Sequence, residues 1–269
     1  MNIQSAMDKA SKIQSSDFWE EIYAIFQEDD GRNFESKKEE VMAMLEKKAK
    51  KLGLELEKVE EETTEAQAFH EKFWDKGIIP IPVVNGVMRK VSDADYDNYI
   101  ALQNENPVNA RLLKDEKSRE YYWNDHINAN ALMCSIIINE EYVGYCGIKD
   151  INKECWEIAV ELFGKNQRKG IGRAAMTSFL DSIKERTGVD EFRIRIFADN
   201  YASQALFEKL GAVPNGTSTF WLHDEESIRK CEEDNMHLID EQICMVAKKF
   251  SVEPRCLLSH VLEYKLCWR

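Results

Sequence analysis

The sequence predicts an α/β protein in which a mixed, mostly antiparallel sheet with flanking helices follows an all-helical N-terminal domain. Only helical periodicity precedes Pro80 and Pro82, and two prolines one residue apart exclude a helix there. After Gly86 the pattern changes to short strands and amphipathic helices. We therefore expect a helical domain over residues 1–85 and an α/β domain over residues 86–269.

The first domain is expected to contain three helices. The first begins at a capping box formed by Asp17 and Glu20, after which apolar residues recur at helical spacing. The second spans about residues 35–52 and ends before Gly53, and the third spans about residues 63–74. The pattern indicates no role for these helices.

The second domain is expected to alternate strands with helices. Its strands are predicted at residues 88–92, 132–139, 142–148, 155–163, 192–197 and 260–267. Its helices are predicted at residues 93–102, 170–187 and 202–210. Glu140 and Glu141 separate two apolar runs and are expected to turn a hairpin.

Residues 224–250 form an insertion between the last two strands. They contain neither proline nor glycine, and their apolar residues recur at helical spacing. We expect one long amphipathic helix. It either packs on the sheet edge or forms a lid over the functional site.

Composition and charge exclude several classes of function. The net charge is −13, without the basic stripe that a phosphate backbone requires, so we expect no nucleic-acid partner. The seven cysteines are odd in number and widely spaced, without a C-x-x-C pair or a histidine cluster. We therefore expect reduced thiols and no metal. Without a signal peptide or a membrane-length apolar run, the protein is expected to be cytoplasmic, with no membrane partner.

A glycine-rich turn between a strand and a helix is the main functional signal. The segment runs Leu162-Phe-Gly-Lys-Asn-Gln-Arg-Lys-Gly-Ile-Gly-Arg173. Such a turn directs free N–H groups and the positive end of the helix dipole at one point, and glycines let an anion approach. Three basic residues surround the point: Arg168, Lys169 and Arg173. This arrangement is typical of a diphosphate-binding site.

Three interpretations of the turn must be distinguished. Gly170-x-Gly172-x-x-Ala175 is a weak form of the dinucleotide fingerprint, for which Asp199 would be the acidic partner. The turn is also compatible with a purely structural helix start. However, charged and amide residues precede the first glycine, and a hairpin precedes the turn, which disfavours a nicotinamide-binding domain.

The third interpretation rests on a resemblance. Gln167-Arg-Lys-Gly170-Ile-Gly172 resembles the acetyl-CoA signature of the GNAT superfamily of N-acetyltransferases. Asn200-x-x-Ser203, followed by Leu206-Phe-Glu-Lys-Leu-Gly211, resembles the second part of the family's cofactor site. The strands Val143–Ile148 and Trp156–Val160 resemble those of the branch that acetylates ribosomal-protein N-termini, the Rim type. Together these elements cover about residues 88–215.

The resemblance implies a GNAT fold and transfer of an acetyl group from acetyl-CoA to a primary amine of a small molecule or a peptide N-terminus. It also allows a homodimer. By this resemblance the strand ending near residue 163 separates from the strand at 192–197. The implied cofactor contacts are Val160, Leu162 and Phe163 for pantetheine, Gln167, Arg168, Lys169, Gly170, Ile171, Gly172 and Arg173 for the diphosphate, and Asn200, Ser203 and Phe207 around the pantetheine arm and sulfur.

Acetyl transfer needs a general base, because an alkyl amine with a pKa of about 10 is protonated at neutral pH. Glu157 and Glu161 lie at one parity of the same predicted strand and are the candidates. The Glu157 position matches the acidic residue of the Rim-type strand. The alternative is that either carboxylate is merely hydrogen-bonded or exposed.

The proton for the departing thiolate has a less obvious source. Many GNAT proteins carry a tyrosine at the position of Phe207, and phenylalanine cannot donate a proton. Ser203, water or Tyr201 would have to substitute. A second hypothesis is therefore a non-catalytic CoA-binding sensor or interaction module on a GNAT scaffold.

Overall fold

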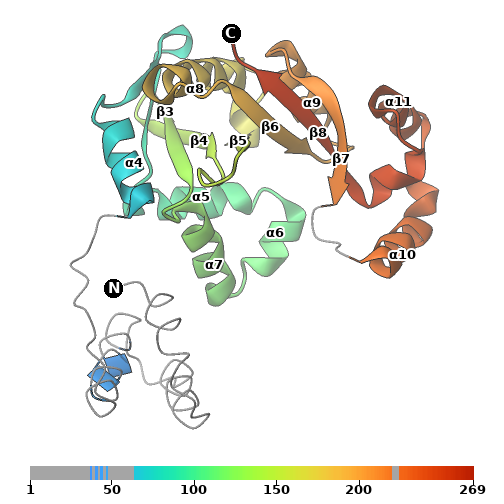
Figure 1. The fold of residues 1–269 in the computed structure, drawn as a ribbon, viewed down its shortest axis with the longest axis horizontal. Coiled ribbons are helices and arrows are strands. Elements are labelled where there is room, and N and C mark those ends of the chain that lie inside the picture. The colour runs from blue at the N-terminus through green and yellow to red at the C-terminus, as the bar shows by residue number, and fades with distance from the viewer. Residues whose placement is uncertain (1–36, 38–39, 42, 45–46, 48–63, 220–223) are drawn as a thin grey trace. The chain divides into compact units, whose positions relative to one another are not determined.

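The computed structural model describes residues 37, 40, 41, 43, 44, 47, 64–219 and 224–269 (Figure 1). It divides into the units Met1–Thr64 and Glu65–Arg269. The first helix expected in the N-terminal domain lies outside the described residues. Of the second, the described positions are helical. No helix in the described part of the chain is long and apolar enough to cross a membrane.

The unit from Glu65 is built on an eight-stranded sheet with the order β1-β2-β3-β4-β5-β6-β8-β7. The strands are β1 (Ile79–Ile81), β2 (Gly86–Lys90), β3 (Leu132–Ile138), β4 (Glu141–Ile148), β5 (Trp156–Leu162), β6 (Glu191–Ile196), β7 (Val213–Thr219) and β8 (His260–Cys267). All neighbouring strands are antiparallel except the parallel pair β5 and β6. The predicted fold class, a mixed and mostly antiparallel sheet with flanking helices, is confirmed.

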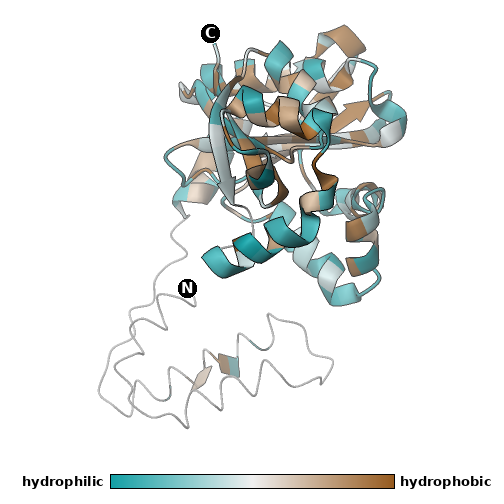
Figure 2. Cartoon of the chain, turned by 90° about the vertical axis from the view of Figure 1, so that its right-hand side faces the viewer, coloured by the Kyte–Doolittle hydropathy of each residue, from teal (hydrophilic) through white to brown (hydrophobic). Residues whose placement is uncertain are grey.

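Helices cover both faces of this sheet (Figure 1). The α-helices of this unit are α4 (Glu65–Trp74), α5 (Tyr96–Gln103), α6 (Pro107–Leu112), α7 (Glu116–His126), α8 (Ile171–Thr187), α9 (Tyr201–Lys209), α10 (Glu225–Asn235) and α11 (Glu241–Phe250). Short 3-10 turns occupy η1 (Pro82–Val84), η2 (Asp93–Asp95), η3 (Gly164–Asn166), η4 (Met236–Leu238) and η5 (Pro254–Leu258). The helices carry hydrophobic and hydrophilic residues side by side, as amphipathic helices do (Figure 2).

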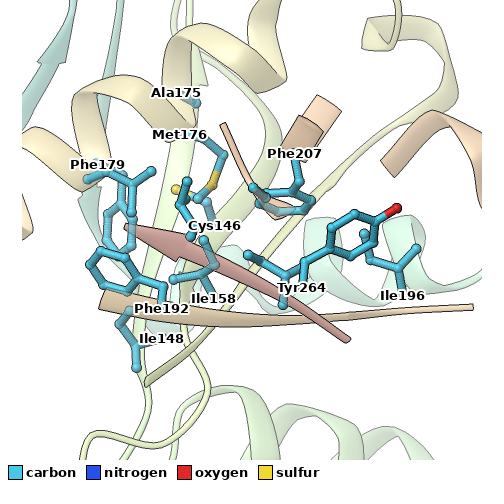
Figure 3. Close-up of a cluster of buried hydrophobic side chains, with 14 of the residues drawn as sticks. Cys146, Ile148, Ile158, Ala175, Met176, Phe179, Phe192, Ile196, Phe207 and Tyr264 are labelled. Atoms are coloured by element: carbon cyan, nitrogen blue, oxygen red, sulfur yellow. The ribbon is translucent and has the colours of Figure 1, made fainter. Parts of the chain in front are cut away.

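The main core lies between α8 and the sheet. Met176 and Phe179 of α8 are fully buried and lie with Ile158 and Phe192 of the central strands (Figure 3). Each such side chain stabilises the fold by about 1.5–3 kcal/mol. A smaller aromatic cluster, which includes Trp123, covers the opposite face under α5 and α7. The two faces of β5 therefore have different neighbours.

The compact unit begins before the domain boundary expected at residue 85. Strand β1 pairs with β2 through Ile79 and Ile81, which are 1% and 0% exposed, and Phe73 of α4 is 2% exposed in the same core. Pro80 is tolerated because β1 is the edge strand, where a missing N–H breaks no ladder. The prolines thus mark a sheet edge instead of a linker.

The insertion predicted at residues 224–250 is present between β7 and β8, but it is two helices instead of one. A 3-10 turn separates α10 from α11, and Asp240 caps α11 by accepting a hydrogen bond from the Ile243 N–H at 2.8 Å. Helix α11 buries Val246 and Phe250, and Phe250 meets Tyr264 edge-on. Of the two roles considered, packing on the sheet edge describes α11.

The boundary can be tested with two shortened chains. A chain beginning at Glu65 should keep a cooperative thermal transition, because α4 and β1 remain in the core. A chain beginning at Asn85 lacks Phe73, Ile79 and Ile81, each worth about 1.5–3 kcal/mol, and should melt much lower or aggregate. Melting followed by circular dichroism measures both. Equal melting temperatures would show that α4 and β1 do not belong to this unit.

Candidate active site

Strands β5 and β6 are paired only where they begin. Their parallel register joins Trp156 to Phe192 and Glu157 to Arg193. On its other side, β5 pairs with β4 as far as Leu162. The C-terminal half of β5 therefore has one paired edge and one open edge. This is the separation that the family resemblance implied for these two strands.

The backbone of β5 alternates between these two edges. The Glu157 carbonyl accepts a hydrogen bond from the Lys149 N–H, just after β4, at 2.9 Å, and the Phe163 N–H donates one to the Val143 carbonyl of β4 at 3.1 Å. Because bonded pairs alternate in an antiparallel ladder, Val160 and Leu162 direct their backbone groups to the open edge. Of the three residues predicted to contact pantetheine, these two offer N–H groups there. The Phe163 N–H is already used by β4.

Gln167 joins the loop after β5 to the end of that strand. Its Nε2 donates to the Leu162 carbonyl at 2.9 Å. At the start of the same loop, the Gly164 N–H donates to Glu105 Oε2 at 2.7 Å. Gln167 was predicted to bind the diphosphate. In this arrangement its amide shapes the loop that presents the next residues.

The first turn of α8 presents free N–H groups. Gly170 is the N-cap residue with φ 81°, and the Ala174 N–H makes a helical hydrogen bond to its carbonyl at 3.0 Å. The preceding N–H groups, of Ile171, Gly172 and Arg173, have no acceptor within the helix. A Cβ at Gly170 would meet nothing within 4 Å. An anion can therefore approach the positive end of α8 closely.

Basic side chains surround this turn. Arg168, Lys169 and Arg173 are all exposed, as expected of residues that meet a charged ligand. Arg168 also has φ 58°, an uncommon conformation for a residue with a Cβ. Such backbone strain collects at functional sites. The chemistry of these groups fits a diphosphate.

Phe207 of helix α9, which was predicted to lie beside the pantetheine arm, has its side chain in the core. Phe207 is 3% exposed and lies in the core beside Met176 and Tyr264 (Figure 3). Its neighbour Leu206 instead approaches the diphosphate turn, because a Cβ at Gly172 would lie 3.6 Å from Leu206 Cδ2. One-residue differences of this kind follow from helix rotation, which periodicity alone does not fix.

Asn200 and Ser203 begin α9. The Asn200 Oδ1 accepts a hydrogen bond from the Ser203 N–H at 3.1 Å, so Asn200 is the N-cap of the helix. Ser203 is half-buried, whereas Tyr201, the other proton donor considered, is 41% exposed. This capping hydrogen bond fixes the backbone position of Ser203 at the start of α9.

Glu157 is enclosed by cations. Its Oε1 is 2.7 Å from Lys149 Nζ, and its Oε2 is 2.7 Å from Arg195 Nε and 3.4 Å from Arg193. Burial alone would raise the pKa of Glu157, but the charges and hydrogen bonds of Lys149 and Arg195 outweigh it and hold that pKa below its usual range. A carboxylate with both oxygens in ion pairs is poorly placed to accept a proton.

Glu161 lies in the opposite environment on the same face of β5. Its Oε2 accepts hydrogen bonds from Gln103 Nε2 and the Tyr145 hydroxyl, both at 2.8 Å. Burial raises the pKa of Glu161 above its usual range. The two hydrogen bonds oppose the rise and the nearby Glu105 adds to it. A carboxylate whose pKa is moved toward neutrality is suited to general-base chemistry.

A chain of hydrogen bonds orients Glu161 from the helices above it. The Asn109 Nδ2 donates to Gln103 Oε1 at 2.9 Å, and the Tyr122 hydroxyl donates to Asn109 Oδ1 at 3.2 Å. Since the ionised carboxylate of Glu161 can only accept, it fixes the orientation of both amides, and the phenol then donates to the Asn109 oxygen. Glu161 was predicted from the sequence, but these partners, which are distant along the chain, were not.

Residues 87–213 match the family model described as an acetyltransferase (GNAT) domain. The fold is similar to that of RimL, a ribosomal α-N-protein acetyltransferase solved with coenzyme A. The identity is 15% and the TM-score 0.51, over 71% of this chain and 98% of that one. For Mycobacterium smegmatis RimJ with CoA-disulfide the values are 12% and 0.47, over 71% and 86%. No curated protein sequence matches the chain significantly.

The fold, the open edge of β5 and the family match define the class. The chain carries a GNAT acetyltransferase domain, as the glycine-rich signature predicted. It is an acetyl-CoA-dependent N-acetyltransferase, and acetyl-CoA is its acetyl donor. At 15% identity, the likeness to RimL establishes the fold and not the acceptor.

The diphosphate site can be tested with two glycines at opposite ends of α8. Gly170 and Gly188 have φ 81° and 80°, and a Cβ at either meets nothing within 4 Å. Gly170→Ala and Gly188→Ala should therefore cost similar stability, about 1 kcal/mol. Only Gly170→Ala should weaken acetyl-CoA binding in calorimetry, by about tenfold (1.4 kcal/mol). Equal acetyl-CoA affinity in both variants would show that the diphosphate does not bind at this turn.

Proposed function

We propose that the enzyme acetylates a primary amine, carried by a small molecule or a peptide N-terminus, with Glu161 as the general base. The supporting observation is the environment of Glu161, a half-buried carboxylate with neutral hydrogen-bond partners and a raised pKa. In the described part of the chain both hydrogen-bond donors to Glu161 bind Oε2. Oε1 is therefore available to an acceptor amine.

The steps follow from these groups. Glu161 accepts a proton from the bound ammonium, and the freed nitrogen lone pair attacks the thioester carbonyl carbon. The carbon–sulfur bond then breaks, which releases the acetylated amine and the CoA thiolate. The nitrogen loses its second proton as the amide forms, and we place the Ser203 hydroxyl, or water, as the relay that passes this proton to the thiolate, since Phe207 is a core residue. The amine's proton stays on Glu161 until solvent removes it.

The charge of the protein supports a cationic acceptor. The net charge is −13, which concentrates cations near the surface. Next to Glu161, the carboxylate of Glu105 has the same sign, and the His126 pKa is lowered to about 4 by burial, so that His126 is neutral. A protonated amine is attracted to this environment and an anionic acceptor is not.

Glu161→Gln tests the assignment of the base. Glutamine can still accept both hydrogen bonds through one oxygen, but it cannot take a proton. The acetylation rate should fall by at least about 100-fold, measured as CoA thiol release over a panel of primary amines. Thermal stability should not fall, because the raised pKa means that the charged form disfavours folding at neutral pH. Acetyl-CoA affinity should also be retained.

Glu157→Gln is the matched control, since it lies four residues away on the same face of β5. It breaks ion pairs to Lys149 and Arg195, so it should lower stability by about 1–3 kcal/mol. Acetylation by the folded fraction should stay within a few-fold of the unchanged enzyme. If Glu157→Gln is the inactive variant and Glu161→Gln is nearly normal, the two roles are reversed. Acetyl-CoA binding without thiol release for any amine would instead support a sensor.

The pH dependence of the reaction gives an independent test. Glu161 acts only when ionised, so kcat/KM should rise with pH through its pKa. The Tyr145 hydroxyl lowers that pKa by its hydrogen bond. Tyr145→Phe removes the bond, so the acidic limb of the profile should move to higher pH. If the acidic limb does not move, or moves to lower pH, the pH dependence of kcat/KM does not report the ionisation of Glu161.

A further inference from the structure

Strand β4 carries a one-residue bulge against β3. The consecutive residues Ile136 and Ile137 pair with Gly144 and Tyr142, so one residue of β4 is extra between them. Only glycine fits at position 144, because a Cβ there would overlap the carbonyl oxygen of Glu161. Gly144 therefore allows β4 to approach β5 at the proposed base, whose partner across the strands is the next residue, Tyr145.

The bulge brings Tyr142 and Tyr145 to the same face of the sheet, although they are three residues apart. Tyr145 pairs with Ser135. Tyr142 pairs with Ile137, which has the same parity on β3. Ser135 donates a hydrogen bond to Asp95 at 2.8 Å, just before α5, which identifies this as the face covered by α5 and α7. Without the bulge, Tyr142 would point toward α8.

Tyr142 lies next to the proposed base on this face. Glu161 is paired with Tyr145 across β4 and β5. Phe163, two residues beyond Glu161, meets the Tyr142 ring edge-on with ring centres 6.3 Å apart. The four side chains therefore form one group on two adjacent strands, at the end of β5 where its other edge opens.

The Tyr142 hydroxyl has no hydrogen-bond partner within the described part of the chain. The residue is only 9% exposed and its oxygen is shielded from solvent. In contrast, the neighbouring Tyr122 and Tyr145 hydroxyls both donate hydrogen bonds. An unpaired buried hydroxyl costs about 1–3 kcal/mol. A phenylalanine would fill the same space without that cost, so the hydroxyl needs a reason other than packing.

We propose that the Tyr142 hydroxyl donates a hydrogen bond to an oxygen of the acceptor, close to the amine held by Glu161, so that the enzyme selects amines that carry such an oxygen. Burial raises the pKa of Tyr142 well above its usual value, so the hydroxyl stays protonated and can donate. Because no described side chain or backbone group pairs with it, a ligand gains this bond without breaking one within the protein. Phe163, which is half-buried, is the neighbour that would move to admit the acceptor.

This proposal rests on the proposed function and narrows its acceptor. Amino alcohols, amino sugars and α-amino amides carry a hydroxyl or carbonyl oxygen next to the amine. Simple alkylamines and polyamines do not. A site that contains a buried donor discriminates against ligands that leave the donor unpaired.

Tyr142→Phe tests the proposal through selectivity. Thiol release is measured with two probe amines of similar size, glycinamide and n-butylamine, and with larger members of each class. In the unchanged enzyme kcat/KM should favour the oxygen-bearing class. Tyr142→Phe should lower the ratio between the two classes by about 3- to 10-fold, the effect of one hydrogen bond. Its melting temperature should be equal or higher, because only an unpaired hydroxyl is lost.

A control variant and the pattern of rates distinguish failure of the Tyr142 proposal from failure of the proposed function. Tyr121→Phe removes a hydroxyl from a 70% exposed side chain of α7 and should leave both rates unchanged. An equal loss for both classes in Tyr142→Phe would place the hydroxyl on the thioester and overturn the proposal. A lower melting temperature with an unchanged ratio would make the hydroxyl structural, which also overturns it. If the enzyme acetylates only amines without such an oxygen, the proposal is also overturned. If no amine is turned over, the proposed function itself fails, and this inference with it.

Discussion

The limited pairing between β5 and β6 is the constraint on which the site depends. The strands are joined at Trp156 and Glu157 and nowhere beyond. Ion pairs from Glu157 to Arg193 and Arg195 hold the two strands together at this point. Past it, the even-numbered residues of β5 expose their backbone groups along an open edge. Helix α8 begins after a short loop, so its N-terminus lies at the end of the same edge.

The same strand explains why two glutamates of one parity have different chemistry. Glu157 lies in the paired half of β5, where three cations meet it and its pKa is lowered. Glu161 lies four residues on, beside α5, where its partners are a neutral amide and a phenol and its pKa is raised. Environments that move two carboxylates in opposite directions are a recurring feature of acid–base sites. Family resemblance pointed first to Glu157, and the surroundings of the two side chains favour Glu161.

Local signals predicted much of the fold. The glycine turn, helix α8 and the strand at His260–Cys267 were predicted because each carries its own period and caps. Helices α6 and α7 were missed, although Asn106 and Asp115 provide N-cap signals. Strand β1 was missed because its prolines suggested a linker, and only the tertiary pairing reveals an edge. The partners of Glu161 come from distant segments, so the spacing of residues along the chain could not reveal them.

Three unfavourable local features lie around this one end of β5. Arg168 adopts a left-handed conformation, the Tyr142 hydroxyl has no partner among the described residues, and the carboxylate of Glu161 is partly desolvated. Because the pKa of Glu161 is raised in the fold, its ionisation reduces stability as the pH rises through that range. The backbone strain at Arg168 and the unpaired hydroxyl of Tyr142 each cost of the order of 1–3 kcal/mol. The fully buried face of α8 on the other side of the sheet, with Met176 and Phe179, supplies apolar burial that offsets them. One face of β5 thus stabilises the fold by apolar burial, and the other face carries Glu161 beside Tyr142 and Tyr145 of the neighbouring strand.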